Sequence, residues 1–166
     1  MSVLSKTDSA ASEINPVEFE SAVVESAVYE SAVLIDTNGF MIPIQFGIDI
    51  FSELKRLGFS QFLTVPAVIY ELDKLSRTVK GNDKTAVRIA RRLSERCRII
   101  NDFGSDSGGS SGSRVKYADD IIIESALKYS VAVLTNDSVL RQKLMQKGIR
   151  VVSMRQTNRL DFIHQK

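Results

Sequence analysis

The stretch "KYADDIIIESALKYSVAVLTND" (residues 116–137) joins an apolar helical pattern to a short, wholly apolar run that is typical of a strand. Asp119 and Asp120 stand at the head of the helix, and Asp137 follows the strand. A short continuous apolar run suits a strand buried on both faces of a parallel sheet. Aspartate is seldom buried without a partner, so three aspartates at the edges of such apolar segments indicate a site.

Strand and helix patterns alternate on both sides of this stretch. Strands are predicted at "AVLI" (32–35), "FLTV" (62–65), "RII" (98–100), "VAVLT" (131–135) and "IRVVSM" (149–154). Helices are predicted at 48–58, 66–77, 82–97, from about Tyr117, and at 138–148. In the helix at 82–97, Asn82 is the expected cap, and the expected buried stripe is Ala86, Ala90, Leu93 and Cys97. The alternation predicts an α/β fold with three α/β/α layers around a central, mostly parallel sheet.

The domain organisation follows from composition along the chain. Residues 1–31 are an acidic, low-complexity lead-in that we expect to be partly disordered, and residues 20–33 repeat the letters ESAV. That repeat is either a duplicated low-complexity segment or a docking segment for a partner. Residues 32–166 are expected to form a single domain, with a flexible Gly/Ser loop at 104–113.

Composition narrows the chemistry. The chain of 166 residues is 43% hydrophobic and 25% charged, which is ordinary for a globular domain. No apolar run is long enough to span a membrane, and no secretory signal pattern precedes the domain. The lone cysteine, Cys97, excludes an internal disulfide framework and predicts a reducing, cytoplasmic location. The lone histidine, His164, lies near the C-terminus, which argues against a Cys/His zinc site and against histidine-based catalysis.

Five carboxylates in four segments fall where an α/β fold places its ligands. Asp36 directly follows the strand at 32–35, and Asp137 lies just past the strand at 131–135. Asp119 and Asp120 open the preceding helix, and Glu71 lies one turn into the helix after 62–65. Ligands in such folds bind beyond the carboxyl ends of the strands, so these side chains are expected to converge.

Converging carboxylates with no lysine or arginine between them repel one another, and a divalent cation removes that repulsion. All-oxygen ligands suit Mg²⁺ or Mn²⁺ rather than zinc. Two such ions can clamp a phosphodiester and generate hydroxide without a histidine. Each residue alone has a structural alternative: Asp36 and Asp137 as helix caps, Glu71 as an inert exposed side chain, and Asp119 and Asp120 as partners of the helix dipole.

The order "IDTN … PAVIYELDKL … YADD … LTND" resembles the PIN domain family of metal-dependent ribonucleases, over roughly residues 32–155. The resemblance implies two ions, Mg²⁺ or Mn²⁺, and assigns the acids and their neighbours. The implied catalytic ligands are Asp36, Glu71, Asp119 and Asp137, with Asp120 at the metal site directly or through water, and with Asn38, Thr135 and Asn136 in support. Adjacent helical residues point about 100° apart, and the spacing to the next strand favours Asp119 as the direct ligand.

Within that family, "ADD", "TNDSVLRQKL" and "MRQTNRL" are most similar to the archaeal and eukaryotic branch of small-subunit ribosomal RNA processing. This implies an endoribonuclease that cuts single-stranded or loop RNA, with a ribosomal RNA precursor as substrate. The expected protein partners are ribosome-assembly proteins or a second copy of the chain. The alternatives are a catalytically silent RNA-binding scaffold and a toxin-type ribonuclease of a toxin–antitoxin pair. A haloacid-dehalogenase-type phosphatase is disfavoured, because Asn38 stands where that class needs its second aspartate.

Basic residues give a candidate RNA surface. Residues 37–166 carry a net charge of +8, against −6 for residues 1–36. Arg88, Arg91, Arg92 and Arg96 share much of one helical face and could hold RNA phosphates. The alternative is a solvated, arginine-rich helix. With no tryptophan and no RNP-like strand, an aromatic stacking platform is not expected.

Overall fold

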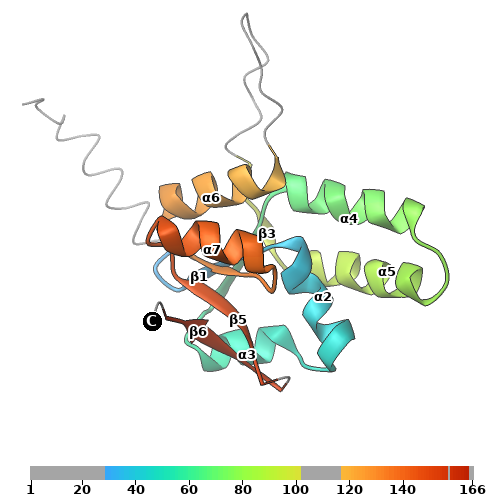
Figure 1. Cartoon of the computed structure of the whole chain (residues 1–166), viewed down its shortest axis with the longest axis horizontal. Coiled ribbons are helices and arrows are strands. Elements are labelled where there is room, and N and C mark those ends of the chain that lie inside the picture. Colours follow the sequence, from blue (N-terminus) through green and yellow to red (C-terminus); the bar gives the residue numbers. More distant parts are fainter. Residues whose placement is uncertain (1–28, 102–116, 157, 165–166) are drawn as a thin grey trace, which may run out of the picture.

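The computed structural model describes residues 29–101, 117–156 and 158–164, so the lead-in up to residue 28 and the loop at 104–113 lie outside it. Figure 1 shows strands alternating with helices along the chain. The elements are β1 (Ala32–Ile35), α2 (Thr37–Phe46), α3 (Ile50–Arg56), β2 (Gln61–Thr64), α4 (Pro66–Thr78), α5 (Asn82–Ser94), β3 (Arg98–Ile99), α6 (Ala118–Tyr129), β4 (Ala132–Leu134), α7 (Ser138–Gln146), β5 (Val151–Arg155) and β6 (Arg159–Ile163).

The strands form one sheet in the order β3-β2-β1-β4-β5-β6, in which only β6 is antiparallel to its neighbour. This confirms the predicted mostly parallel sheet. The chain runs from β1 outward through β2 and β3, then returns to the other side of β1 with β4. The gap between β1 and β4 is therefore the topological switch point, where ligands bind in such sheets. Ile35 pairs with Leu134 across this gap, so Asp36 and Thr135 follow the two strands side by side.

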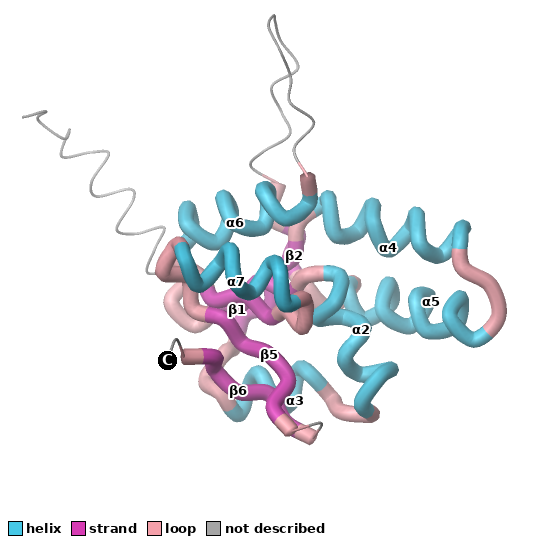
Figure 2. Tube along the Cα trace, viewed as in Figure 1, coloured by secondary structure: helices cyan, strands magenta, loops and turns pink. Residues whose placement is uncertain are grey.

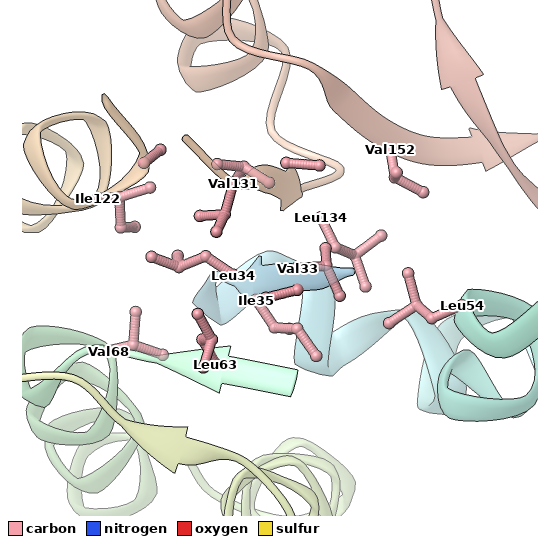
Figure 3. Close-up of a cluster of buried hydrophobic side chains, with 14 of the residues drawn as sticks. Val33, Leu34, Ile35, Leu54, Leu63, Val68, Ile122, Val131, Leu134 and Val152 are labelled. Atoms are coloured by element: carbon pink, nitrogen blue, oxygen red, sulfur yellow. The ribbon is translucent and has the colours of Figure 1, made fainter. Parts of the chain in front are cut away.

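Helices cover both faces of the sheet, which gives the predicted three layers (Figure 2). All four residues of β1 are fully buried, as expected for a strand with a helix layer on each side. Figure 3 shows the strand side chains between Val68 of α4 and Ile122 of α6 on one side and Leu54 of α3 on the other. This packing fixes the strand ends that carry the candidate site.

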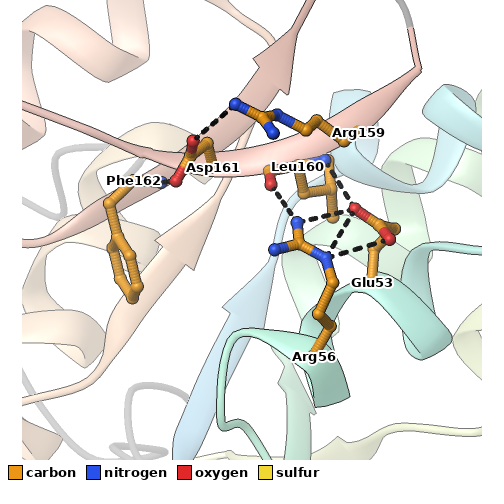
Figure 4. Close-up of polar contacts among 6 residues, drawn as sticks. All are labelled: Glu53, Arg56, Arg159, Leu160, Asp161 and Phe162. Atoms are coloured by element: carbon orange, nitrogen blue, oxygen red, sulfur yellow. Dashed lines mark hydrogen bonds and ion pairs between the residues drawn. The ribbon is translucent and has the colours of Figure 1, made fainter.

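Two elements were not among the helices and strands predicted from the sequence patterns, although a helix capped by Asp36 was one alternative. The helix α2 begins directly after Asp36 and contains Pro43, and it ends at Gly47, whose left-handed backbone (φ 69°) lets its N–H donate to the Pro43 carbonyl. The strand β6 is held by α3 (Figure 4). There the Arg56 guanidinium donates to the Leu160 carbonyl at 2.6 Å, and Glu53 Oε2 accepts from the Leu160 N–H at 3.0 Å.

The helix α5 differs in detail from the prediction. Its cap residue is Gly81, which has no side chain to cap with, and Asn82 is the first helical residue. Its buried residues are Val87, Ala90 and Ser94. The expected stripe was therefore right at Ala90, whereas Ala86, Leu93 and Cys97 are only partly buried. Packing against both α2 and α4 rotates the buried face in this way. Leu93 and Cys97 still pack on the core at its edge, and burial raises the pKa of the Cys97 thiol to about 12, which makes it unreactive.

None of the described helices has the length and apolar character that a membrane-spanning helix needs.

Candidate active site

Asp36 lies at the centre of the candidate site. It follows β1 and is only 3% exposed. One carboxylate oxygen, Oδ1, accepts from the Gly39 N–H at 2.5 Å, so Asp36 caps α2, as the structural alternative anticipated. The other oxygen, Oδ2, accepts from the Thr135 hydroxyl at 2.7 Å. Capping and a place in the site are therefore compatible, because each oxygen keeps a further lone pair.

Thr135 joins the two strand ends. Its side chain is fully buried, donates to Asp36 and accepts from the Asp137 N–H at 3.0 Å. Asp137 then caps α7, because its Oδ1 accepts from the N–H groups of Val139 (2.7 Å) and Leu140 (3.0 Å). Its Oδ2 stays outside this cap and lies 3.5 Å from the Asn38 amide nitrogen, which donates to it. Thr135 thus holds Asp36 and Asp137 in fixed relation.

Glu71 reaches the site from α4 through a residue that the sequence analysis did not identify. The Thr37 hydroxyl donates to Glu71 Oε2 at 2.5 Å, although 34 positions separate the two residues. Thr37 is the first residue of α2 and is buried. Its place directly after Asp36 was the only sequence signal for this role.

Asp119 and Asp120 lie in a different environment. Asp119 forms an ion pair with Lys143 of α7, with 2.9 Å between Oδ2 and Nζ. Asp119 shares a helical face with the buried Ile122 and Ile123, whereas Asp120 is exposed. The hydrogen bond that Lys143 donates to Asp119 raises the pKa of Lys143, as do the charges of Asp119, Asp120 and Asp137. The expectation that no cation stands among these carboxylates was therefore wrong at Asp119.

The side chain of Asn136 is directed away from the other candidate residues. Its Oδ1 accepts from the hydroxyl of the buried Ser153 on β5 at 3.1 Å, so its side chain is directed to the neighbouring strand. It fixes the segment between Thr135 and Asp137 rather than contributing an oxygen to the site.

Of the four arginines proposed to bind RNA, Arg91 and Arg96 make contacts within the protein, and Arg88 and Arg92 do not in the part of the chain that the structure describes. Arg91 forms ion pairs with Asp73 of α4 at 3.0 Å and with Glu95 at 3.5 Å. Arg96 lies beyond the end of α5, with its guanidinium carbon 3.9 Å from the centre of the Phe51 ring. Arg88 and Arg92 are exposed on α5. Two of the four are thus committed to contacts within the protein.

The electrostatics single out Asp36. Burial raises the pKa of this carboxyl from its ordinary 3.8 to about 7; hydrogen bonds from Thr135 and Gly39 lower it in part, and the charges of Asp137 and Glu71 raise it further. An uncompensated buried carboxylate beside two other acids is a strong site for a cation.

The donor set fits a hard divalent ion, because every candidate ligand is a carboxylate oxygen. As the side chains stand, however, no three acidic, histidine or cysteine residues of the described chain lie close enough together to hold one ion. The acids form two groups: Asp137 and Glu71 act on Asp36, whereas Asp119 and Asp120 act on Lys143. An ion could bind Glu71 while Thr37 still donates to it, because the carboxylate keeps further lone pairs, but at Asp119 the ion would compete with the ammonium group of Lys143.

The raised pKa of Asp36 predicts the pH dependence of the metal-free protein. Between the unfolded value of 3.8 and the folded value of about 7, the folded chain binds more protons at this carboxyl than the unfolded chain. Stability from this group is therefore complete at low pH and is lost as the pH rises through about 7. In EDTA, we expect the free energy of unfolding to fall by about 2 kcal/mol from pH ~5.5 to ~8.

Thermal or urea unfolding across this range would measure the loss, and Asp36→Asn would supply the control by flattening the profile. A wild-type protein that became more stable toward pH ~8 in EDTA would contradict the assignment. The depressed pKa values of Asp49 and Glu53 act below this window, so they do not obscure it.

Comparisons with known proteins agree on one family. A family model described as a PIN-like domain matches residues 33–157. Ribonuclease VapC9 of Archaeoglobus fulgidus is 32% identical over 127 residues, covering 76% of this chain and 85% of that protein. Ribonuclease VapC4 of Methanocaldococcus jannaschii is 29% identical over 129 residues, covering 75% and 90%. The solved structure of the PIN domain endonuclease Utp24 superposes with a TM-score of 0.62 at 26% identity, covering 79% of this chain and 90% of that one.

Proposed function

This chain belongs to the PIN-like domain family, and from that premise we propose that it is a metal-dependent endoribonuclease that hydrolyses single-stranded or loop RNA. The observation that carries the proposal is the buried carboxyl of Asp36 at the switch point between β1 and β4. It has no basic partner among the described residues, and the charges of Asp137 and Glu71 act on it. The relatives named as ribonucleases support the reaction class.

The ligands of the ion or ions are the oxygens of Asp36, Glu71, Asp119 and Asp137, with Asp120 acting through water. A bound divalent ion would lower the pKa of a water molecule and offset charge on the scissile phosphodiester. The chain's own residues orient these oxygens: Thr135 and Gly39 hold Asp36, Asn38 holds Asp137, and Thr37 holds Glu71. The single histidine, His164, is exposed beyond β6, so the acids carry the proton transfers.

Lys143 has two roles in the proposed reaction, one before and one after the ion binds. While Asp119 is free of metal, Lys143 neutralises it, and ion binding would release the ammonium group to face the RNA phosphates. Magnesium and manganese both suit the oxygen ligands, and we propose that either supports the reaction. A ribosomal RNA precursor is the proposed natural substrate, on the strength of the "ADD", "TNDSVLRQKL" and "MRQTNRL" motifs.

A catalytically silent RNA-binding scaffold is the second candidate. The ion pair between Lys143 and Asp119 favours it, because a lysine occupies a ligand that a nuclease would need.

Incubation of the full chain with end-labelled single-stranded and stem–loop RNA tests the two candidates. The nuclease predicts cleavage with Mn²⁺ or Mg²⁺, none in EDTA, and products with 5′-phosphate and 3′-hydroxyl ends. Cleavage should concentrate in unpaired segments. RNA binding with no cleavage at any concentration of either ion would contradict the nuclease and favour the scaffold.

A further inference from the structure

Two tyrosines stand exposed beside the candidate site. Tyr70 is 72% exposed and Tyr117 is 76% exposed, whereas the other two tyrosines, Tyr29 and Tyr129, are each 6% exposed. Tyr70 directly precedes Glu71, and Tyr117 precedes Asp119 by two positions. Single scattered apolar residues on a surface need no explanation, whereas exposed aromatic side chains that gather next to a site are candidates for contacts with a ligand.

The two tyrosines lie at the starts of α4 and α6, which are close together in the structure. Tyr117 is the residue that immediately precedes α6, and Tyr70 lies in the second turn of α4. The helices α4 and α6 contact each other, and Figures 1 and 2 both show the start of α6 beside the start of α4. The exposed aromatic rings therefore belong to one part of the surface.

The outer face of α4 adds positive charge. Lys74 and Arg77 follow Tyr70 by four and seven positions, so the three side chains share a face opposite the buried Val68 and Leu72. Both cations are exposed, and between described residues no ion pair joins either of them to an acid. This free charge contrasts with Arg91 and Arg96 of the neighbouring segment, which are held by Asp73 and Phe51.

Aromatic rings interleaved with cations match the chemistry of a single-stranded nucleic acid. Bases stack on exposed rings without regard to sequence, and lysine and arginine bind the phosphates between them. A double helix offers no exposed base faces, so this arrangement selects unpaired strands.

We propose that Tyr70 and Tyr117 form a base-stacking subsite for single-stranded RNA, and that Lys74 and Arg77 bind the phosphates of the same strand. This subsite rests on the proposed function, and it gives the nuclease its preference for unpaired RNA. It moves the RNA-binding surface from α5 to the outer face of α4 and the start of α6.

The test measures binding without cleavage. Fluorescence anisotropy of a labelled, unstructured 12-nucleotide RNA would be followed with the full chain in EDTA, in parallel with an oligonucleotide of equal length whose central positions are abasic. The variants are Tyr70→Ala, Tyr117→Ala, Tyr70→Phe and Lys74→Ala. Leu127→Ala, exposed on α6, and Lys55→Ala, exposed on α3 against the opposite face of the sheet, are the matched controls.

Each tyrosine-to-alanine change should weaken binding of the base-bearing RNA by roughly tenfold and leave binding of the abasic strand nearly unchanged. Tyr70→Phe should bind as the wild type does. Lys74→Ala should weaken both strands alike and reduce the salt dependence by about one phosphate contact. The two controls should stay within about twofold of the wild type.

Three results would overturn the subsite: tyrosine variants that bind as the wild type does, equal losses for base-bearing and abasic strands, or a wild type that binds neither strand at low salt. The proposed function is judged separately, by metal-dependent cleavage. A wild type that cleaves RNA while the tyrosine variants bind normally would keep the nuclease and remove the subsite. A wild type that binds RNA through its tyrosines but never cleaves it would keep the subsite and remove the nuclease.

Discussion

Replacing Asp36 with asparagine is expected to abolish metal-dependent RNA cleavage and, in the same variant, to stabilise the metal-free protein. The carboxyl is buried beside Asp137 and Glu71, and burial raises its pKa to about 7. Asparagine keeps the size and the hydrogen-bond acceptor for the Gly39 N–H, but it removes the buried charge. The same change therefore deletes the proposed central metal ligand and relieves the repulsion among the acids.

The expected loss of cleavage is at least about 1,000-fold, because metal-ion stabilisation of a phosphodiester transition state contributes several kcal/mol. At pH ~8 in EDTA, the melting temperature of Asp36→Asn should exceed that of the wild type by several degrees. Asp83→Asn, an exposed change in the first turn of α5, is the matched control: it should leave cleavage unchanged and should lower the melting temperature slightly, because a first-turn carboxylate contributes about 0.3–1 kcal/mol through the helix dipole. A cleavage rate within tenfold of the wild type would remove Asp36 from the centre of the mechanism. A destabilised variant would contradict the electrostatic assignment.

Gly39→Ala is expected to destabilise the fold and to disrupt the site together. A Cβ atom at this position would lie 2.8 Å from the Leu134 carbonyl oxygen, 3.0 Å from Ile35 Cγ2 and 3.1 Å from Asp36 Oδ1. The carbonyl belongs to β4 and cannot move without shifting the strand. Only glycine lets α2 start close enough to the sheet for its N–H to reach the Asp36 carboxylate.

The sign of this effect is diagnostic. Replacing glycine with alanine inside a helix ordinarily stabilises a protein by up to about 1 kcal/mol. Here the clash should instead cost about 1–3 kcal/mol and lower cleavage as Asp36 is displaced. Gln45→Ala, an exposed change on the same helix, is the control and should be neutral or slightly stabilising. Chemical denaturation of the two variants measures the difference, and a Gly39→Ala protein more stable than the wild type would show that α2 lies farther from β4.

The sequence predicted the strand-helix alternation because β1 and β4 are buried on both faces, and such strands are continuous apolar runs. The helix α2 was not predicted, because "TNGFMIP" contains Gly39 and Pro43 and shows no apolar stripe. Its formation depends on the cap that Asp36 supplies and on contact with α3, α4 and α5. The strand β6 likewise depends on Glu53 and Arg56, which lie more than 100 positions earlier.

In the candidate site too, the residues that follow local sequence patterns could be predicted, and the contacts between distant residues could not. Asp36 and Asp137 could be placed from the sequence, since Asp36 directly follows one recognisable strand pattern and Asp137 lies just past another at the same edge of the sheet. The partners of Glu71 and Asp119 could not, because Thr37 and Lys143 reach them across 34 and 24 positions. Helical spacing also predicted that Arg91 would face the solvent. In the structure, packing of α5 against α4 brings Arg91 into an ion pair with Asp73.

The most direct test is calorimetric titration of Mn²⁺ into the wild type and Asp36→Asn at pH ~7, repeated in two buffers of different ionisation enthalpy. A carboxyl with a pKa of about 7 is partly protonated at this pH, so ion binding must displace a proton. We predict saturable binding to the wild type with release of a substantial fraction of a proton, and loss of most affinity in Asp36→Asn. Equal affinity in the two proteins, or binding to the wild type without proton release, would contradict a metal site built on Asp36.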